Sequence, residues 1–138
     1  MPALTPAAAR HRFSSARVAR LATASPAAVP HLVPIVFAVH AGTIYHGVDA
    51  KPKRTVALRR LTNLTANPAV SLLADHYAED WTTLWWARAD GRARLLPAGS
   101  PEEILGAGLL VGRYPQFELR GPMVAVDVEN WSGWTATA

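Results

Sequence analysis

The stretch from Leu21 to Val48 contains no Asp, Glu, Lys or Arg, and this limits the folds that the chain can adopt. Its length is sufficient for a helix that crosses a bilayer. Three prolines interrupt it, however, and Ala41-Gly42 is a turn signal in its second half. We therefore expect buried β-strands here, and no membrane partner.

The composition indicates one compact domain that spans residues 1–138. Half of the residues are hydrophobic and 17% are charged, which excludes a disordered chain. The sequence has no cysteine, so disulfides, thiolate nucleophiles and cysteine zinc sites are excluded. Because no apolar run of signal-peptide type follows the N-terminal arginines, we expect a cytoplasmic protein.

Local patterns predict six strands and three helices. The strands are expected at 18–23, 31–40, 43–48, 70–74, 81–96 and 124–128, and the helices at 6–15, from 52 to Asn67-Pro68, and at 101–113. A bulge is expected near Asp90-Gly91. The order lacks the βαβ alternation of a doubly wound sheet. We therefore predict a mainly β (α+β) fold, an antiparallel barrel with peripheral helices.

Several catalytic classes lack their motifs in this chain. No P-loop and no Gly-x-Ser-x-Gly elbow is present. Only His76 has carboxylates close by, at Asp75, Glu79 and Asp80. A solvated acidic turn is the favoured interpretation of that loop over a metal site. We therefore predict no metal site, and the patterns identify no catalytic residue.

A basic segment concentrates the excess positive charge of the chain, which is +4 overall. It carries no acid and contains Lys51, Lys53, Arg54, Arg59 and Arg60. One interpretation is the solvated face of a helix. The other is a phosphate site, because Lys51, Lys53 and Arg54 lie at the start of a predicted helix, where free N–H groups attract anions. A charge this localised does not favour nucleic acid as a partner.

The tryptophans form two groups. Trp81, Trp85 and Trp86 lie on one predicted strand, and Trp131 and Trp134 lie in a predicted C-terminal tail. Such rings build a core, an interface or a wall for a planar ligand. Because neighbouring strand residues point to opposite faces, either Trp85 or Trp86 needs cover from a partner subunit or a flat cofactor.

The order of several segments resembles a known family. They are Ala19-Arg20-Leu21-Ala22-Thr23, Pro30-His31-Leu32-Val33-Pro34-Ile35-Val36-Phe37, Lys51-Pro52-Lys53-Arg54, Leu58 to Leu64, Asn67 to Leu72, Asp80-Trp81 through Arg88, Gly91-Arg92-Ala93 and Trp131-Ser132-Gly133-Trp134. Over about residues 17–134 the chain resembles split-barrel flavin and deazaflavin oxidoreductases of the pyridoxamine-phosphate-oxidase-like superfamily. The resemblance is to their actinobacterial branch, which uses coenzyme F420.

This resemblance implies a six-stranded split β-barrel of the FMN-binding type. It also implies a homodimer with two cofactor sites across its interface. The implied cofactor-binding residues fall into four sets: Lys51 and Lys53 on the phosphate with Arg54 in reach, the backbone of Pro34, Ile35 and Val36 against the ring, the strand end His46, Gly47 and Val48 beside it, and Trp85 or Trp86 with Trp134 from the partner as a wall.

The resemblance implies an enzyme that transfers a hydride from reduced coenzyme F420 to an electron-poor small molecule of quinone, enone or tetrapyrrole type. Two alternatives stay open: an FMN-dependent oxidoreductase of the same fold, and a cofactor or haem carrier without turnover. Tyr77 and Tyr114 are both candidate proton donors. The region from Arg113 to Pro122 is shorter than in the subgroup that the chain resembles, so the resemblance does not define the substrate entrance there.

Overall fold

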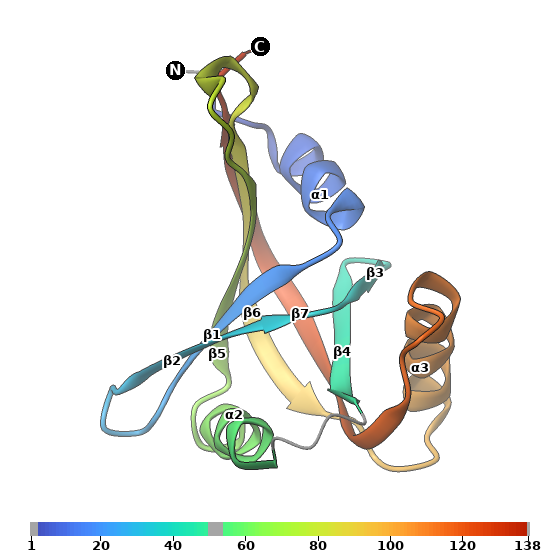
Figure 1. The fold of residues 1–138 in the computed structure, drawn as a ribbon. Coiled ribbons are helices and arrows are strands. Elements are labelled where there is room, and N and C mark those ends of the chain that lie inside the picture. Colours follow the sequence, from blue (N-terminus) through green and yellow to red (C-terminus); the bar gives the residue numbers. More distant parts are fainter. Residues whose placement is uncertain (1–2, 50–53, 138) are drawn as a thin grey trace.

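The computed structural model of the protein describes residues 3–49 and 54–137, and the side chains of these residues except 49 and 54–58 (Figure 1). Three helices and seven strands lie within the described part. In chain order they are α1 (Pro6–Ser15), β1 (Ala19–Ala24), β2 (Pro30–Ile35), β3 (Ala38–His40), β4 (Thr43–Asp49), α2 (Arg54–Ala66), β5 (Ala69–His76), the 3-10 turn η1 (Trp81–Thr83), β6 (Trp85–Leu95), α3 (Pro101–Arg113) and β7 (Leu119–Thr135).

All seven strands form one antiparallel sheet in the order β2-β1-β5-β6-β7-β4-β3. The two edge strands, β2 and β3, follow each other in the chain with only Val36 and Phe37 between them. The three peptide steps from Ile35 to Ala38 span at most about 11 Å. The sheet must therefore curl until its two edges approach each other.

The prediction of a six-stranded closed barrel is wrong in two respects. The strand expected over 31–40 is divided at Val36-Phe37, which adds a seventh strand. The edges β2 and β3 do not pair with each other in the described part of the chain, so the sheet is open. The division has a physical cause: β2 pairs with β1, whereas β3 pairs with β4, and one straight strand cannot serve both.

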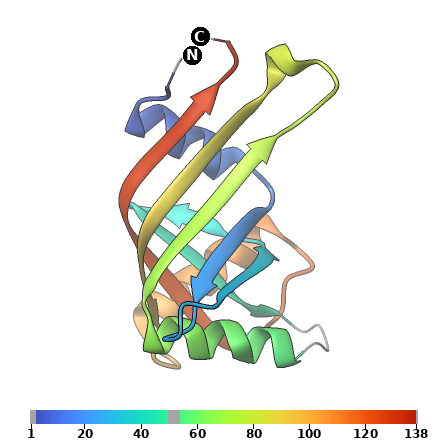
Figure 2. The same cartoon turned by 90° about the vertical axis from the view of Figure 1, so that its left-hand side faces the viewer.

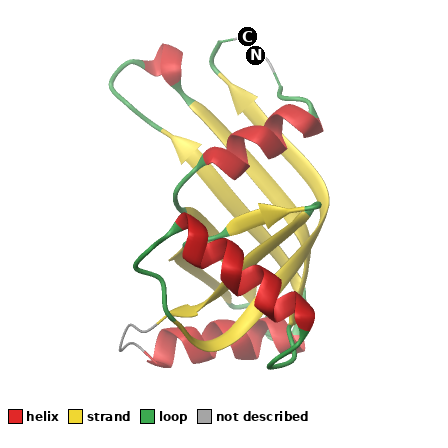
Figure 3. Ribbon diagram, turned by 90° about the vertical axis from the view of Figure 1, so that its right-hand side faces the viewer, coloured by secondary structure: helices red, strands yellow, loops and turns green. Residues whose placement is uncertain are grey.

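The helices cover the sheet unevenly. Helix α1 packs on β6 and β7, α3 packs on β4, and α2 lies across the other end of the sheet, against β1 and β6 (Figure 3). The opposite face of β5, β6 and β7 has no helix on its upper part (Figure 2). No helix among the described residues is long and apolar enough to cross a membrane.

The helices predicted at 6–15 and 101–113 and the turn predicted at Ala41-Gly42 are confirmed by the backbone. Thr5 caps α1 by accepting from the N–H of Ala8, and Ser100 caps α3 by accepting from that of Glu103. Ala41 and Gly42 both have positive φ, of 49° and 80°. Two such residues in succession are what a tight hairpin turn requires.

The C-terminal tryptophans correct another prediction. Trp131 and Trp134 do not lie in a tail, because β7 continues to Thr135 and pairs with β6 from Val124 to that end. Trp81 does not lie in β6 but in η1, where the Asp80 carboxylate accepts from the N–H of Thr82 at 3.0 Å. The capped turn therefore occupies Trp81–Thr83, and the strand β6 begins only at Trp85.

The expected bulge at Asp90-Gly91 is present. Asp90 pairs with Asn130 and Gly91 with Val128, so β7 carries one extra residue there. A methyl group on Gly91 would collide with the carbonyl oxygen of Asp127 and lie 3.0 Å from the Cα of Val128. Both are backbone atoms of the paired strand, so only a shift of the strand backbone could relieve the collision.

We expect Gly91→Ala to lower the free energy of unfolding by about 1–3 kcal/mol, as overpacking does. The matched control is Gly108→Ala, because nothing lies within 4 Å of the added methyl group on α3. That control should raise the stability by roughly 0.5–1 kcal/mol through helix propensity. Urea unfolding of both variants measures this, and equal effects would contradict the bulge geometry.

Candidate functional site

The predicted ring-binding segments lie where two strands diverge. The β3–β4 ladder runs from His40↔Thr43 to Ala38↔Tyr45 and stops there. Beyond this point the chain preceding β3 turns away and pairs with β1, as β2. Val36 and Phe37 on one side therefore lie across from the continuation of β4 at His46 and Gly47, without a ladder between them.

The backbone along this divergence has free edges. β2 is an edge strand, so one side of Pro34 and Ile35 has no strand partner within the described residues. β4 continues to pair with β7 through Gly47, but beyond Tyr45 no strand of the described chain pairs with its other edge. Pro34 is exposed, Val36 is half-buried and Ile35 is buried. Because Ala38 pairs with Tyr45, the segments that end at Val36 and begin at His46 both adjoin the last paired residues of β3 and β4.

The end of β4 is bent and closely packed. The register shifts between Gly47 and Asp49. A side chain on Gly47 would meet the Sδ of Met123 and a methyl carbon of Leu119, at 2.7 and 2.8 Å. Val48 lies against Gly121 in the same way. Small residues at this point let β4 approach β7 before it leads towards α2.

His46 is the most unusual side chain of this region. It is 1% exposed, and neither ring nitrogen has a hydrogen-bond partner within residues 3–49 and 54–137. Burial, followed by the charge of Arg60, lowers the pKa of His46 to about 3. The imidazole is therefore neutral at neutral pH.

Helix α2 places polar groups inside the molecule. Arg59 is exposed, but Arg60 and Asn63 are 8% and 6% exposed, so the interpretation of the basic segment as a solvated helix face is wrong for Arg60. The Asn63 amide donates to the hydroxyl of Thr23 at 3.2 Å. Leu61 and Leu64 mark the inner face of the helix in the sequence pattern, and Arg60 and Asn63 directly adjoin that face.

The predicted phosphate-binding residues are described only in part. Lys51 and Lys53 lie outside the described residues. Arg54 is the first residue of α2, and its side chain is also outside the described part. The structure therefore shows a helix that begins at Arg54, within the basic segment, and the phosphate site stays a prediction.

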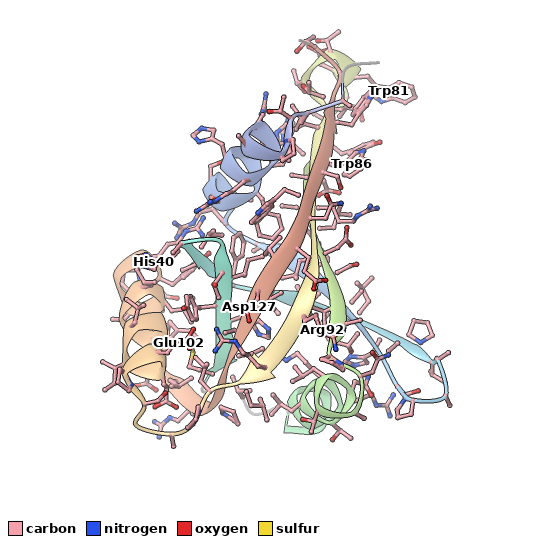
Figure 4. All side chains as sticks on the ribbon, turned by 180° about the vertical axis from the view of Figure 1, so that it is seen from behind. His40, Trp81, Trp86, Arg92, Glu102 and Asp127 are labelled. Atoms are coloured by element: carbon pink, nitrogen blue, oxygen red, sulfur yellow. The ribbon has the colours of Figure 1, made fainter. Side chains whose placement is uncertain are left out.

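The tryptophans of the predicted wall lie at the opposite end of the sheet from the end of β4. Trp86 pairs with Trp134, and Trp85 pairs with Thr135, near the end of the sheet where the two termini lie (Figure 1). Trp86 appears at this end in Figure 4, whereas β4 leads to α2 at the other. A single chain does not bring the tryptophans to His46.

The two strand neighbours Trp85 and Trp86 face opposite sides, as expected. Trp85 packs against the main core beside α1, with the guanidinium of Arg12 5.5 Å from its ring. Trp86 and its partner Trp134 share the face away from α1, where Arg88 lies 5.8 Å from the Trp86 ring. Both rings remain partly exposed on that face.

A model of the pyridoxamine 5'-phosphate oxidase family matches residues 5–134. The chain belongs to this family. The comparison with curated proteins gives no match. Family membership confirms the coarser part of the sequence resemblance, while the cofactor and the reaction stay predictions.

Solved structures share the family fold at low identity. An FAD-binding protein from Mesorhizobium loti is 21% identical with a TM-score of 0.74, covering 96% of this chain and 93% of that one. An FAD-binding protein from Mycobacterium smegmatis is 20% identical with a TM-score of 0.64, covering 97% of each. The haem storage protein HutZ from Vibrio cholerae is 15% identical with a TM-score of 0.72, covering 91% and 90%. These identities show the fold alone.

One charged cluster of this family member was missed by sequence reasoning. Arg94 donates to both oxygens of Glu102 at 2.7 Å and to Asp127 at 2.7 and 3.1 Å. The Tyr45 hydroxyl donates to Glu102 at 2.8 Å. Burial and then Glu102 raise the pKa of Tyr45 to about 12.

This cluster joins β4, β6 and β7 to the first turn of α3. The Ser100 cap fixed the position of Glu102 on the helix, and this signal was available in the sequence. The partners Arg94 and Asp127 come from two strands far apart in the chain, so no local pattern pointed to them. No group of three His, Asp or Glu suited to a metal ion lies within the described part of the family member.

Proposed function

We propose that this family member is an oxidoreductase that holds coenzyme F420 against the diverging strands β2 and β4, with FMN as the alternative cofactor. The observation that carries the proposal is the end of the β3–β4 ladder at Ala38↔Tyr45. It leaves one backbone edge of Pro34–Val36 and one of His46–Val48 without a strand partner in the described part of the chain. A planar heteroaromatic ring with carbonyl and N–H groups suits such edges.

The residues present fit this kind of cofactor. Both ring nitrogens of His46 lack partners in the described chain, which is a cost of about 1–3 kcal/mol per group that a ligand hydrogen bond would offset. Lys51 and Lys53 are proposed to hold the phosphate, beside the start of α2 at Arg54. The excess of basic residues in this segment suits the anionic tail of coenzyme F420.

Bound deazaflavin or flavin supplies a two-electron hydride donor. The chain then needs to orient the ring, exclude water and admit an electron-poor acceptor of quinone, enone or tetrapyrrole type. This assignment requires no side-chain nucleophile or metal ion. The neutral His46 adds no charge to the proposed pocket.

A homodimer is proposed because the site is incomplete in one chain. Trp86 and Trp134 are half-buried on the upper part of a sheet face, where no helix of the described chain lies (Figure 2), and they are at the opposite end from His46. A second copy that covers this face in antiparallel fashion would bring its tryptophans towards β4 of the first. Analytical ultracentrifugation should give a dimer for the native chain and a monomer for Trp86→Asp, and a native monomer would contradict this.

Titration with three ligands tests the proposed function. Fluorescence quenching should show binding of coenzyme F420 at about micromolar concentration, and reduced cofactor on the protein should be oxidised by quinone-type acceptors. The double variant Lys51→Ala, Lys53→Ala should bind at least about tenfold more weakly, with loss of about 1.4 kcal/mol or more. Arg120→Ala, an exposed arginine on β7, is the matched control.

The three ligands separate the alternatives. Tighter binding of FMN than of coenzyme F420 would reassign the cofactor within the same site. Binding of haemin alone would favour a haem carrier, the class of the structurally similar HutZ. Absence of both F420 and FMN binding would refute the proposed function.

A further inference from the structure

The C-terminal end of α3 holds the break between β2 and β3. The guanidinium of Arg113 donates to the carbonyl of Phe37 at 2.8 Å and also to the carbonyl of Ala16. Its carbon lies 4.9 Å from the centre of the Phe37 ring. One side chain thus binds the backbone and the ring of Phe37 and ties both to the end of α1.

Tyr114 binds the same residue. Its hydroxyl oxygen lies 3.0 Å from the carbonyls of Phe37 and Arg17, which share its single proton. The N–H of Phe37 points at the same oxygen, at 3.4 Å. Arg17 stacks on the Tyr114 ring at 4.7 Å and donates to the carbonyl of Arg113. We call Arg17, Arg113 and Tyr114 the crossover clamp.

The clamp replaces sheet pairing where pairing ends. Val36 and Phe37 belong to neither β2 nor β3, and they carry the chain from one edge of the sheet to the other. Buried backbone groups must find hydrogen-bond partners, and Phe37 is 0% exposed. The side chains of α3 supply these partners, so the path of the crossover depends on them.

From these contacts we propose that Arg113 and Tyr114 are positioning residues for the cofactor ring. They fix the position of Phe37. Because Phe37 directly follows Val36, they also fix the end of the Pro34–Val36 backbone, which is proposed to face the ring. This inference rests on the proposed function. A displacement of about 1 Å in a reacting geometry lowers rates by orders of magnitude, so the clamp bears on hydride transfer as well as on binding.

The chemistry of the clamp requires arginine rather than lysine. The planar guanidinium binds two carbonyls with separate N–H groups and still stacks on Phe37. A lysine ammonium keeps the charge but has no planar face to stack. Arg113→Lys therefore loosens the crossover while it leaves the charge in place.

The test compares Arg113→Lys and Tyr114→Phe with Arg94→Lys. Arg94 binds the opposite end of α3 through Glu102 and binds β7 through Asp127, so this control removes a similar set of bonds away from the crossover. Coenzyme F420 and FMN are titrated into each variant, and the absorption spectrum of the bound ring and the thermal midpoint are recorded.

We expect Arg113→Lys and Tyr114→Phe to bind about tenfold more weakly, equivalent to about 1.4 kcal/mol, and to shift the bound-ring spectrum. Arg94→Lys should lower the thermal midpoint but keep the native affinity and spectrum. If the clamp variants bind with native affinity and spectrum, only this inference falls. If the native protein binds neither cofactor, the proposed function falls and the inference with it.

Discussion

Replacement of Phe37 by alanine is expected to lower the free energy of unfolding by about 3–5 kcal/mol. The ring is fully buried, 4.8 Å from the ring of Phe13 and under the guanidinium of Arg113. Its removal leaves a cavity where α1, α3 and the crossover meet. The remaining backbone cannot collapse into this space, because the carbonyl of Phe37 is held by Arg113 and Tyr114.

Chemical denaturation of Phe37→Ala and Tyr77→Ala provides the comparison. Tyr77 is also aromatic, but it is 70% exposed, so its loss should change the stability by no more than about 0.5 kcal/mol. Similar losses in the two variants would show that Phe37 does not lie at the centre of the core as described.

The second large effect is an acid-dependent loss of stability through His46. Its pKa is about 3 in the folded protein and about 6.5 in the unfolded chain. Below pH 6.5 the imidazole of His46 is protonated in the unfolded chain but stays neutral in the folded chain, so the stability of the fold falls as the pH falls towards 3. The slope approaches about 1.4 kcal/mol per pH unit, or about 3 kcal/mol between pH 6.5 and 4.

His46→Leu isolates this contribution from the carboxylates that titrate in the same range. The variant should be at least as stable as the native protein at pH 7, because two unsatisfied nitrogens are removed. Its advantage should grow by about 3 kcal/mol on acidification to pH 4. A constant difference between His46→Leu and the native protein would refute the buried, neutral imidazole.

Local chemistry made much of this fold predictable. The Ser100 cap, the Ala41-Gly42 turn and the Asp90-Gly91 bulge each have a short-range physical cause that is visible in neighbouring residues. The break at Val36-Phe37 has none, because both residues are apolar and no glycine or proline marks the change of partner. That break is set by which strands lie on either side, and strand pairing is a long-range property.

The segments of the proposed site come from the sequence resemblance, and they stay a prediction. The resemblance implies Pro34–Val36 and His46–Val48, and the ladder end at Ala38↔Tyr45 lies between these two segments and the paired part of β3 and β4. The side chains that hold this region, Arg113 and Tyr114, come from the end of α3, more than seventy residues along the chain from Phe37. Only the folded topology brings them there.

Titration of the native protein with coenzyme F420 and with FMN, followed by fluorescence quenching and oxidation of the reduced cofactor, tests the central claim most directly. The account predicts saturable binding of a tricyclic cofactor that weakens in Lys51→Ala, Lys53→Ala and in Arg113→Lys, and that stays native in Arg120→Ala. Native protein that binds neither cofactor, or binding that is indifferent to all of these substitutions, would contradict it.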